Sequence, residues 1–354
     1  MIDAGWERGV LAIERLGNAG LDVSEFRRAS LGMLRSLVSV EAAFFATVDP
    51  ATLLFTAALA EEPLTAATPL FLDNEFGRDD VNKFARLATT ADSVGTLDHA
   101  TRGDRTASAR YREVLRPLGL GDELRVALVT GGRCWGVLCL HRQDLAVGFG
   151  EREIALLRRL APQLAEGLRK GIALFSSAPE ASVVAGPGII VLGPDLSVVS
   201  INAQAQRWLS HLGDADWPMH LDLPLPIYAA AAQVMGYGQQ GAPMPTATRL
   251  RRAEGGWLTV HASPLTGTAG DHIAVILDAA NASQLSSLVL AAHGLTPAQS
   301  RVAALVLQGR STRHIVDELH ISSHTVQEHL RAVFEKFGIG SRRELVAALS
   351  GRPR

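Results

Sequence analysis

The C-terminal segment of the chain carries helix start and stop signals at short intervals, and these constrain the fold more tightly than any other feature. Thr296 precedes Pro297 and lies three residues before Gln299. This is the pattern of a capping box, in which each of the two polar side chains bonds the other residue's backbone N–H, and proline suits the first helical turn. Gly309 is placed to end the helix. The pattern predicts a helix that begins after Thr296 and ends before Gly309.

Three more helices are predicted between this one and Leu349. The second and third are joined by a very short turn, and apolar side chains recur in them at spacings of three and four, which buries one face. The start and stop signals are Ser311, the turn His320-Ile321, Ser322 or Ser323, Gly338, and Ser341 with Glu344. The segment is therefore expected to form an all-α four-helix unit with a helix-turn-helix at its centre.

The exposed face of the third predicted helix is polar and carries Gln327, Glu328 and Arg331. A helix fits the major groove of B-DNA, where such side chains can bond base edges. The N-terminus of a helix, with its hydroxyl side chains, favours contacts with phosphate. Short four-helix units with charged faces also serve as plain interaction modules, so helix spacing alone leaves both functions open.

Charge is divided unevenly along the chain. The net charge is −2 overall, yet residues 291–354 hold nine Lys and Arg against five Asp and Glu, a net of +4, which leaves −6 on the remainder. A basic segment on an acidic body favours a polyanionic partner for that segment alone.

The rest of the chain divides into two segments that mix strand and helix patterns. In the first, Gly131-Gly132 separates two β-rich runs, which predicts a hairpin because both turn positions can adopt positive φ. An amphipathic helix is predicted over 150–170, and Ser176 to Pro179 has the composition of a linker. The second segment has strands at both ends and helices between them. Strands are predicted at 43–48, 53–59, 123–130, 133–141, 188–192, 197–201, 256–264 and 272–277.

The C-terminal segment also resembles a known family at many separate positions. These are Leu295-Thr296-Pro297, Val302 to Leu305, Gly309-Arg310-Ser311, Ile315-Val316, Ile321-Ser322, Thr325-Val326, His329-Leu330 and Lys336-Phe337-Gly338. Over 295–349 the chain is similar to the DNA-binding domain of LuxR/NarL-type regulators.

The resemblance implies roles for individual residues. It implies that the helix from Ser323 to Phe337 is the recognition helix, with Gln327, Glu328 and Arg331 at its base-contacting positions. Phosphate-contacting positions map to Ser311, Thr325, His329 and Arg342, and the last helix is expected to contribute to dimerisation on DNA. The sequence departs from the family at Gln299, Gln327 and Glu328, where the acid could accept from a cytosine amino group or repel phosphates. These departures concern the DNA target and not the fold.

The front segments resemble two sensor families. The runs Leu124 to Val129 and Trp135 to Leu138, followed by the helix at 151–168, look like the end of a GAF domain. The runs Gly188 to Leu192 and Val198 to Asn202 look like the start of a PAS domain. The expected architecture is multidomain α+β, with a GAF-like sensor or dimerisation domain at 1–177, a PAS-like domain at 183–283 and a LuxR-type helix-turn-helix domain at 290–354. Either sheet fold can hold a small ligand or dimerise.

Sites for ligands and metals are much less marked. Trp135, Trp217, Trp257 and His261 are weak candidates for ligand contact, because aromatic residues at such spacings more often form core. The two cysteines are Cys134 and Cys139, and Cys139 would share a strand face with His141. A zinc site needs three or four ligands, and no other cluster in the sequence supplies them, so these residues are expected to be plain core. No cofactor or metal is expected.

These features favour a cytoplasmic, sequence-specific transcriptional regulator. Its expected partners are double-stranded DNA, a second copy of the chain in a homodimer, and a small apolar or aromatic effector, with no membrane. One alternative is a regulator whose front domains only dimerise or bind proteins. Another is an enzyme that a DNA-binding tail localises, although no acid–base or nucleophile constellation supports catalysis, and the chain is not expected to be an enzyme. No secretory signal is expected in the amphipathic, acid-containing start of the sequence.

Overall fold

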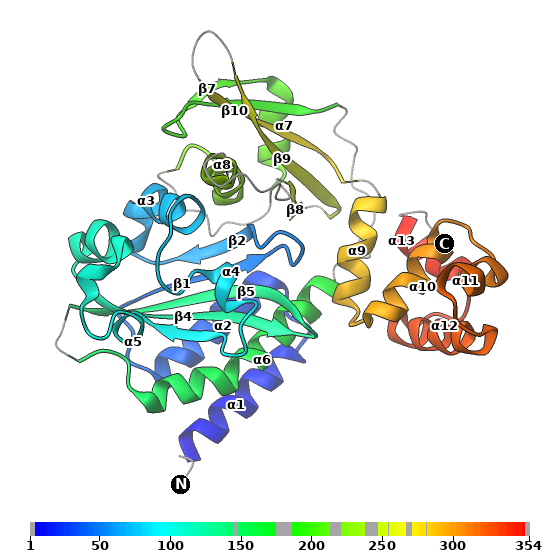
Figure 1. Ribbon diagram of the computed structural model, residues 1–354, viewed down its shortest axis with the longest axis horizontal. Helices are drawn as coiled ribbons and strands as arrows, with labels where there is room; N and C mark the ends of the chain where they lie inside the picture. The colour runs from blue at the N-terminus through cyan, green and yellow to red at the C-terminus, as the bar shows by residue number, and fades with distance from the viewer. Residues whose placement is uncertain are drawn as a thin grey trace.

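The computed structural model describes residues 4–144, 147–174, 186–212, 221–237, 247–253, 255–266, 271–280 and 282–350. Two five-stranded antiparallel sheets are stacked with a helix between them, and a helical C-terminal unit lies to one side (Figure 1). The expected order of two sheet-plus-helix units followed by a helical unit is confirmed at this level. The linker predicted at Ser176 to Pro179 lies outside the described residues.

The first sheet has the strand order β2-β1-β5-β4-β3. Its strands are β1 (Ala42–Val48), β2 (Phe55–Ala60), β3 (Val94–Thr96), β4 (Leu120–Thr130) and β5 (Arg133–Gln143). The predicted hairpin is confirmed: β4 and β5 pair antiparallel around Gly131 and Gly132, whose φ values are 60° and 71°. Both strands are longer than predicted, because β4 begins at Leu120 and β5 continues to Gln143.

Three long helices cover one face of this sheet, below it in Figure 1: α1 (Ala4–Gly17), α2 (Val23–Leu37) and α6 (Glu151–Leu174). Asp22 caps α2 by accepting from the N–H groups of Ser24 and Glu25. Leu157, Leu160 and Leu164 of α6 are fully buried against the sheet, as the amphipathic pattern predicts. None of the described helices, this longest one included, is apolar enough over its length to cross a lipid bilayer.

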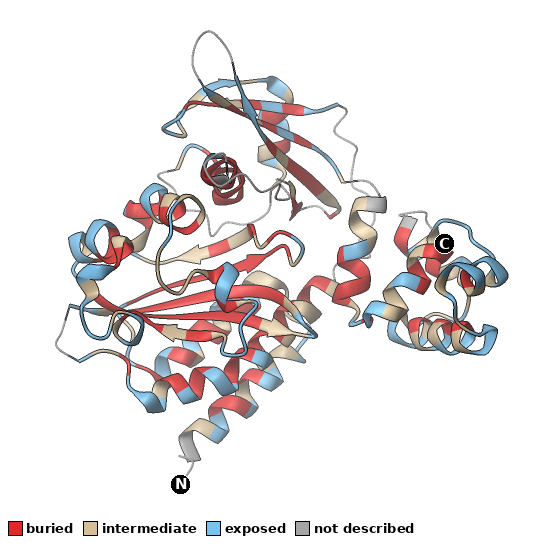
Figure 2. Cartoon of the chain, viewed as in Figure 1, coloured by how far each residue is buried: buried red, intermediate tan, exposed pale blue. Residues whose placement is uncertain are grey.

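The other face of the first sheet is covered by short helices and turns, among them α3 (Thr68–Leu72), α4 (Phe84–Leu87) and α5 (Leu97–Ala100). Phenylalanine rings fill the space there, with Phe55 in contact with Phe44, Phe76 and Phe84. Figure 2 accordingly shows the central strands buried along most of their length.

The second sheet has the order β7-β6-β10-β9-β8, so both sheets connect their strands in the same sequence. Its elements are β6 (Gly188–Leu192), β7 (Val198–Ile201), α7 (Ala203–Ser210), α8 (Leu225–Tyr237), β8 (Ala247–Arg251), β9 (Trp257–Leu265) and β10 (His272–Ala279). Helix α8, which is alanine-rich and buried on nearly all sides, packs against β2 of the first sheet and β9 of the second. The two sheets therefore share one apolar core, with α8 at its centre.

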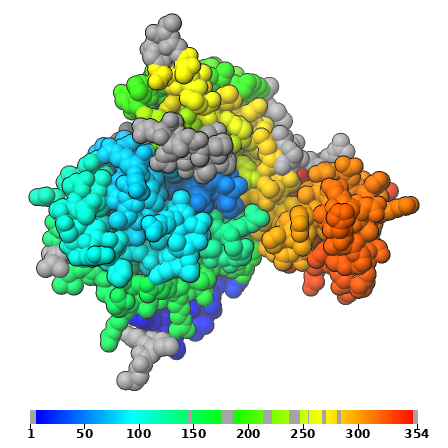
Figure 3. All heavy atoms as spheres, viewed as in Figure 1, coloured from blue at the N-terminus to red at the C-terminus, as the bar shows by residue number. Residues whose placement is uncertain are grey.

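The C-terminal unit contains the four predicted helices: α10 (Pro297–Leu307), α11 (Thr312–Leu319), α12 (Ser323–Phe337) and α13 (Arg342–Ser350). A further helix, α9 (Ala282–Ala292), precedes them and joins them to the body. Its residues Leu288, Ala291 and Ala292 pack into the core around α6, while Val289 and Leu290 pack into the core of the C-terminal unit. The helical unit projects from the side of the molecule, with α9 at its base (Figure 3).

A buried ion pair connects the two sheets. Arg249 of β8 donates from Nε to Oδ2 of Asp49 at 2.7 Å, and its Nη2 bonds the other carboxylate oxygen. The Asp49 side chain is 2% exposed and that of Arg249 is 9% exposed. Removing one partner of such a pair leaves a buried charge without its counter-ion, which is strongly destabilising.

We therefore expect Asp49→Ala to lower the free energy of unfolding by roughly 3–5 kcal/mol, measured as the first transition in urea. Asp92→Ala is the matched control, because Asp92 pairs with Arg158 at the surface, where both side chains are about half exposed. The Asp92→Ala substitution should lower the free energy of unfolding by at most about 1 kcal/mol. Equal effects of the two substitutions would contradict the assignment of Asp49 as a buried connector.

Candidate nucleic-acid interface

The turn between α11 and α12 is built by local hydrogen bonds. His320 ends α11 with a φ of 53°, in the left-handed region. Ser322 then caps α12, since its Oγ accepts from the Thr325 N–H at 3.0 Å and lies 2.8 Å from the Thr325 Oγ1. The sequence left Ser322 and Ser323 as alternative caps, and the structure selects Ser322.

The other predicted caps are also present. Thr296 and Gln299 form the capping box of α10, Ser311 caps α11 through the His314 N–H, and Gly338 ends α12 with a φ of 62°. Ser341 accepts from the Glu344 N–H at the start of α13. Local signals therefore determine where each of these helices begins or ends.

One side of α12 packs into the unit and the other faces solvent. Val326, Leu330 and Val333 are buried in a core that α9, α10, α11 and α13 complete. Gln327, Glu328 and Arg331 are all exposed, so the structure brings the three predicted base-contacting side chains together on one open face. Gln327 and Arg331, one turn apart, line a shallow groove with Glu335.

The predicted phosphate-contacting residues occupy more varied positions. Ser311 is exposed at the start of α11, and Thr325 and His329 are half-buried on α12. Arg342 is half-buried and donates to the backbone carbonyl of Arg310. The Ser311 hydroxyl bonds the N–H and the Nδ1 of His314, and the Thr325 hydroxyl bonds the Ser322 Oγ. Since a hydroxyl has one donor and two acceptor positions, each can still make one more hydrogen bond.

Lys336, near the C-terminal end of α12, bonds residues at the start of the C-terminal unit. Its Nζ donates to the carbonyl of Gly294 at 2.7 Å and to the Gln299 Oε1 at 2.9 Å. The neighbouring Phe337 ring stacks on His293, with ring centroids 3.9 Å apart. The C-terminal end of α12 is thus attached to the junction between α9 and α10.

The carboxyl end of α9 is held from the other side as well. Arg169 of α6 donates to the carbonyl of Ala292, and Gly294 takes a φ of 70° where the helix ends. A cation from the front unit therefore bonds the last carbonyl of α9, as the helix dipole favours, and a cation from α12 bonds the Gly294 carbonyl just beyond the helix. Sequence alone does not reveal this junction, because its partners are more than forty positions apart in the chain.

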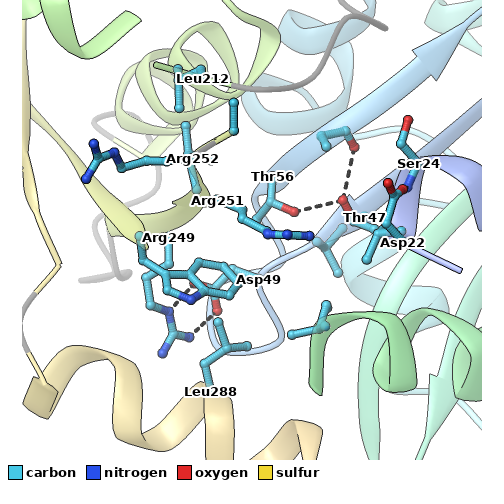
Figure 4. Close-up of a pocket in the computed structure, with 17 residues that line it drawn as sticks. Asp22, Ser24, Thr47, Asp49, Thr56, Leu212, Arg249, Arg251, Arg252 and Leu288 are labelled. Atoms are coloured by element: carbon cyan, nitrogen blue, oxygen red, sulfur yellow. Dashed lines mark hydrogen bonds and ion pairs between the residues drawn. The ribbon is translucent and has the colours of Figure 1, made fainter. Parts of the chain in front are cut away.

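A cavity of about 190 Å³ lies where the two sheets and α9 meet (Figure 4). Thr47, Thr56 and Ala57 line it from the first sheet, Arg251 and Trp257 from the second, and Leu288 from α9. In Figure 4, Arg251 extends toward Thr47 and Thr56, whereas Arg252 points away from them. The candidate Trp257 and the basic residues Arg249 and Arg251 of β8 were the sequence signals for this site. Only the packing of distant segments shows what they face.

The four weak ligand candidates have different outcomes. Trp257 lines the cavity. Trp135 is 1% exposed and is packed in the core beneath α6. His261 is half-buried on β9, on the face opposite Leu258 and Val260, which point into the core. Trp217 lies outside the described residues.

Two family profiles match parts of the chain. Residues 293–349 match the family described as bacterial regulatory proteins, luxR family, and residues 22–168 match the GAF domain. The chain thus carries a LuxR-type helix-turn-helix domain at its C-terminus and a GAF domain at its N-terminus.

Curated relatives match a short stretch of the chain. The putative HTH-type transcriptional regulators Mb0914c of Mycobacterium bovis and MT0914 of Mycobacterium tuberculosis are each 44% identical to this chain over 61 residues. That stretch is 17% of this chain and only 7% of the length of either relative. The likeness therefore covers a small part of each protein.

Solved structures align more loosely. The phycoerythrobilin-bound GAF domain of a cyanobacterial phytochrome aligns with 15% identity and a TM-score of 0.33, over 47% of this chain and 95% of its own. A VqmA–ligand–DNA complex from Vibrio cholerae aligns with 18% identity and a TM-score of 0.23, over 48% and 85%. Scores this low carry no argument about function.

We expect Ser322→Ala to destabilise α12, because it removes the side-chain acceptor for the Thr325 N–H, a loss worth about 1 kcal/mol. Hydrogen exchange of the α12 amides in the full-length protein should speed up roughly fivefold. Ser323→Ala, one position later and equally exposed, should change exchange little. The assignment of the cap would be wrong if Ser323→Ala had the larger effect.

Proposed function

We propose that the chain is a sequence-specific DNA-binding transcriptional regulator. The observation that carries the proposal is the exposed row of Gln327, Glu328 and Arg331 on a helix that is capped, buried on its opposite side and part of a LuxR-type domain. A helix presented in this way can enter the major groove and bond base edges. Ser311, Thr325, His329 and Arg342 are proposed to contact phosphates on either side.

The proposed active form is a homodimer on a two-fold-related DNA site. Two recognition helices about one helical turn of DNA apart would contact successive major grooves, and α13 is proposed to contribute to the contact between the copies. Residues 1–177, 183–283 and 290–354 are proposed as the three domains. The second is proposed to be PAS-like, on the strength of its sequence pattern and its five-stranded antiparallel sheet with α7 and α8.

Control by a small effector is proposed to act through the cavity between the sheets. A cavity of about 150 Å³ is large enough for benzene, so about 190 Å³ suits a single-ring aromatic compound or an aliphatic compound of similar size. Leu288 of α9 lines the cavity, and Arg249 beside it donates to the Gln284 carbonyl at 2.8 Å and to the Ser287 Oγ at 2.9 Å. A compound that displaces Leu288 would therefore move the helix on which the DNA-binding unit is mounted.

In a second candidate function, the chain is a DNA-binding regulator whose front domains bind no small ligand. On the phenylalanine-rich face of the first sheet, the apolar cavity beside Phe44 and Phe71 is only about 20 Å³. A larger cavity of about 420 Å³ beside Phe55 is lined by charged side chains, among them Glu75 and Lys83. The small size of the apolar cavity favours a GAF domain that serves for dimerisation or protein contact. A screen for effectors distinguishes the two functions.

Base and phosphate contacts should respond differently to substitution. On a site selected from random DNA by the wild-type chain, Arg331→Ala should weaken binding by about 1–3 kcal/mol relative to scrambled DNA. Arg342→Ala should weaken binding to both DNAs alike and reduce the slope of log affinity against log salt by about 0.9. Both effects are measurable by fluorescence anisotropy. Unchanged affinity after deletion of residues 290–354 would refute DNA binding by this unit.

The effector proposal predicts thermal stabilisation of the full-length protein by small aromatic compounds. A compound present at 100 times its dissociation constant should stabilise the folded state by about 2.7 kcal/mol. Ala57→Leu, which fills the cavity, should abolish the shift, whereas Ala348→Leu on the exposed side of α13 should preserve it. A shift that persists in Ala57→Leu would place the compound elsewhere, and the absence of any shift across the screen would favour the ligand-free function.

A further inference from the structure

A group of buried polar side chains lies on the inner face of the first sheet, away from both sites described above. Antiparallel pairing of β4 with β5 places Glu123 opposite His141 and Arg125 opposite Cys139. One ligating atom from each of Glu123, Cys139 and His141 lies within 4.8 Å of the other two. None of the three side chains is more than 3% exposed. Glu123 thus supplies the third ligand that the sequence analysis did not find beside Cys139 and His141.

Four atoms in this group have no hydrogen-bond partner within the described protein: Glu123 Oε1, His141 Nδ1, and Nε and Nη1 of Arg125. The Oε2 of Glu123 bonds Arg110 at 2.7–2.8 Å, whereas its Oε1 lies 4.0 Å from both the His141 Nε2 and the Arg125 Nε. An unsatisfied buried polar atom costs about 1–3 kcal/mol, so the unsatisfied atoms of Glu123 and His141 in one buried group favour a bound species there.

The chemistry of the three groups suits a metal ion. His141 offers a ring nitrogen, Cys139 a sulfur and Glu123 a carboxylate oxygen. A thiol binds a metal as its thiolate, so metal binding at Cys139 releases a proton. Sulfur, imidazole nitrogen and carboxylate oxygen form a donor set typical of zinc and ferrous iron.

The surrounding charges permit a cation. Arg110 is paired with Glu123, and Arg125 is paired with Glu75 at 2.6 Å and lies over the Phe84 ring. Each guanidinium charge is therefore balanced by one carboxylate, although Nε and Nη1 of Arg125 make no hydrogen bond within the described protein. A thiolate at Cys139 would cancel half the charge of a divalent ion. The small cavity of about 20 Å³ is lined by His141, Phe44 and Phe71, and it can hold one water molecule.

We propose that Glu123, Cys139 and His141 bind one divalent transition-metal ion of the zinc and ferrous iron class. The ion takes Cys139 Sγ, a nitrogen of His141 and Glu123 Oε1, and its fourth position faces the small cavity, open to water or another small molecule. Metal bonds of about 2.0–2.3 Å place the ligand atoms of a tetrahedral site roughly 3.5 Å apart, so the groups close by about an ångström. As the sulfur–metal bond forms, the S–H bond breaks and its proton leaves to solvent, with no change in oxidation state.

Cobalt(II) titration of the untagged, reduced, full-length protein tests the site. A thiolate bound to Co²⁺ gives a near-ultraviolet charge-transfer band, and we expect this band to saturate at one ion per chain. The chain has two cysteines, both buried on β5, which supply a matched pair of variants. Cys139→Ala should lose the band, and Cys134→Ala should retain it, because the Cys134 thiol bonds the Gly136 carbonyl and lies outside the group.

The proposal is overturned if wild-type protein gives no band, if Cys139→Ala retains it, or if Cys134→Ala loses it while keeping the wild-type circular dichroism. X-ray absorption of zinc-loaded wild-type protein requires no variant. We expect one sulfur neighbour and two or three nitrogen or oxygen neighbours, and a spectrum without sulfur would also overturn the site. Neither measurement depends on DNA binding, so a negative result for the metal site would not contradict the proposed function, and the reverse also holds.

Discussion

Arg249 lies where the parts of the chain meet, and its bonds reach two other parts. The residue belongs to β8 of the second sheet, its carboxylate partner Asp49 lies between β1 and β2 of the first, and Gln284 and Ser287 belong to α9. A buried guanidinium has to satisfy its donors within the protein, because leaving them unpaired is costly. The side chain therefore fixes the two sheets and the helix that bears the C-terminal unit in one relative arrangement.

Helix α9 extends this arrangement to the DNA-binding unit. Its amino-terminal half is bonded by Arg249, its residues Leu288, Ala291 and Ala292 pack into the core around α6, and its last carbonyl accepts from Arg169 of the front unit. Lys336 of α12 bonds the Gly294 carbonyl just beyond the helix. Hydrogen bonds are directional, so a rotation of α9 would strain both bonds. A change around Leu288 that rotates α9 would therefore disturb the contact between the body and the C-terminal unit.

Sequence predicted the features that depend on neighbours in the chain. The hairpin at Gly131-Gly132, the capping box at Thr296 and the left-handed end at Gly338 all depend on interactions within a few residues, and all are confirmed. The contacts of Lys336 with Gly294 and Gln299 could not be predicted, because a helical wheel gives the face of a residue but not the segment that packs against it. Trp135 lies in the core. A buried tryptophan on a strand has the same sequence pattern whether it packs in the core or contacts a ligand, so the sequence could not separate the two.

The group around Glu123 depends partly on neighbours in the chain and partly on the packing of distant segments. The hairpin was predicted, and its register alone places Glu123 opposite His141, so the third ligand could have been found by extending the β4 strand across the turn. What the sequence could not supply is the reason these groups are left unsatisfied. That depends on Arg110 and Glu75, which come from separate segments. Arg110 bonds one oxygen of Glu123, and Glu75 bonds one nitrogen of Arg125. Arg110 takes one oxygen of Glu123 and leaves the other facing His141, so the ion pairs that neutralise the core also set aside the atoms that can bind a metal.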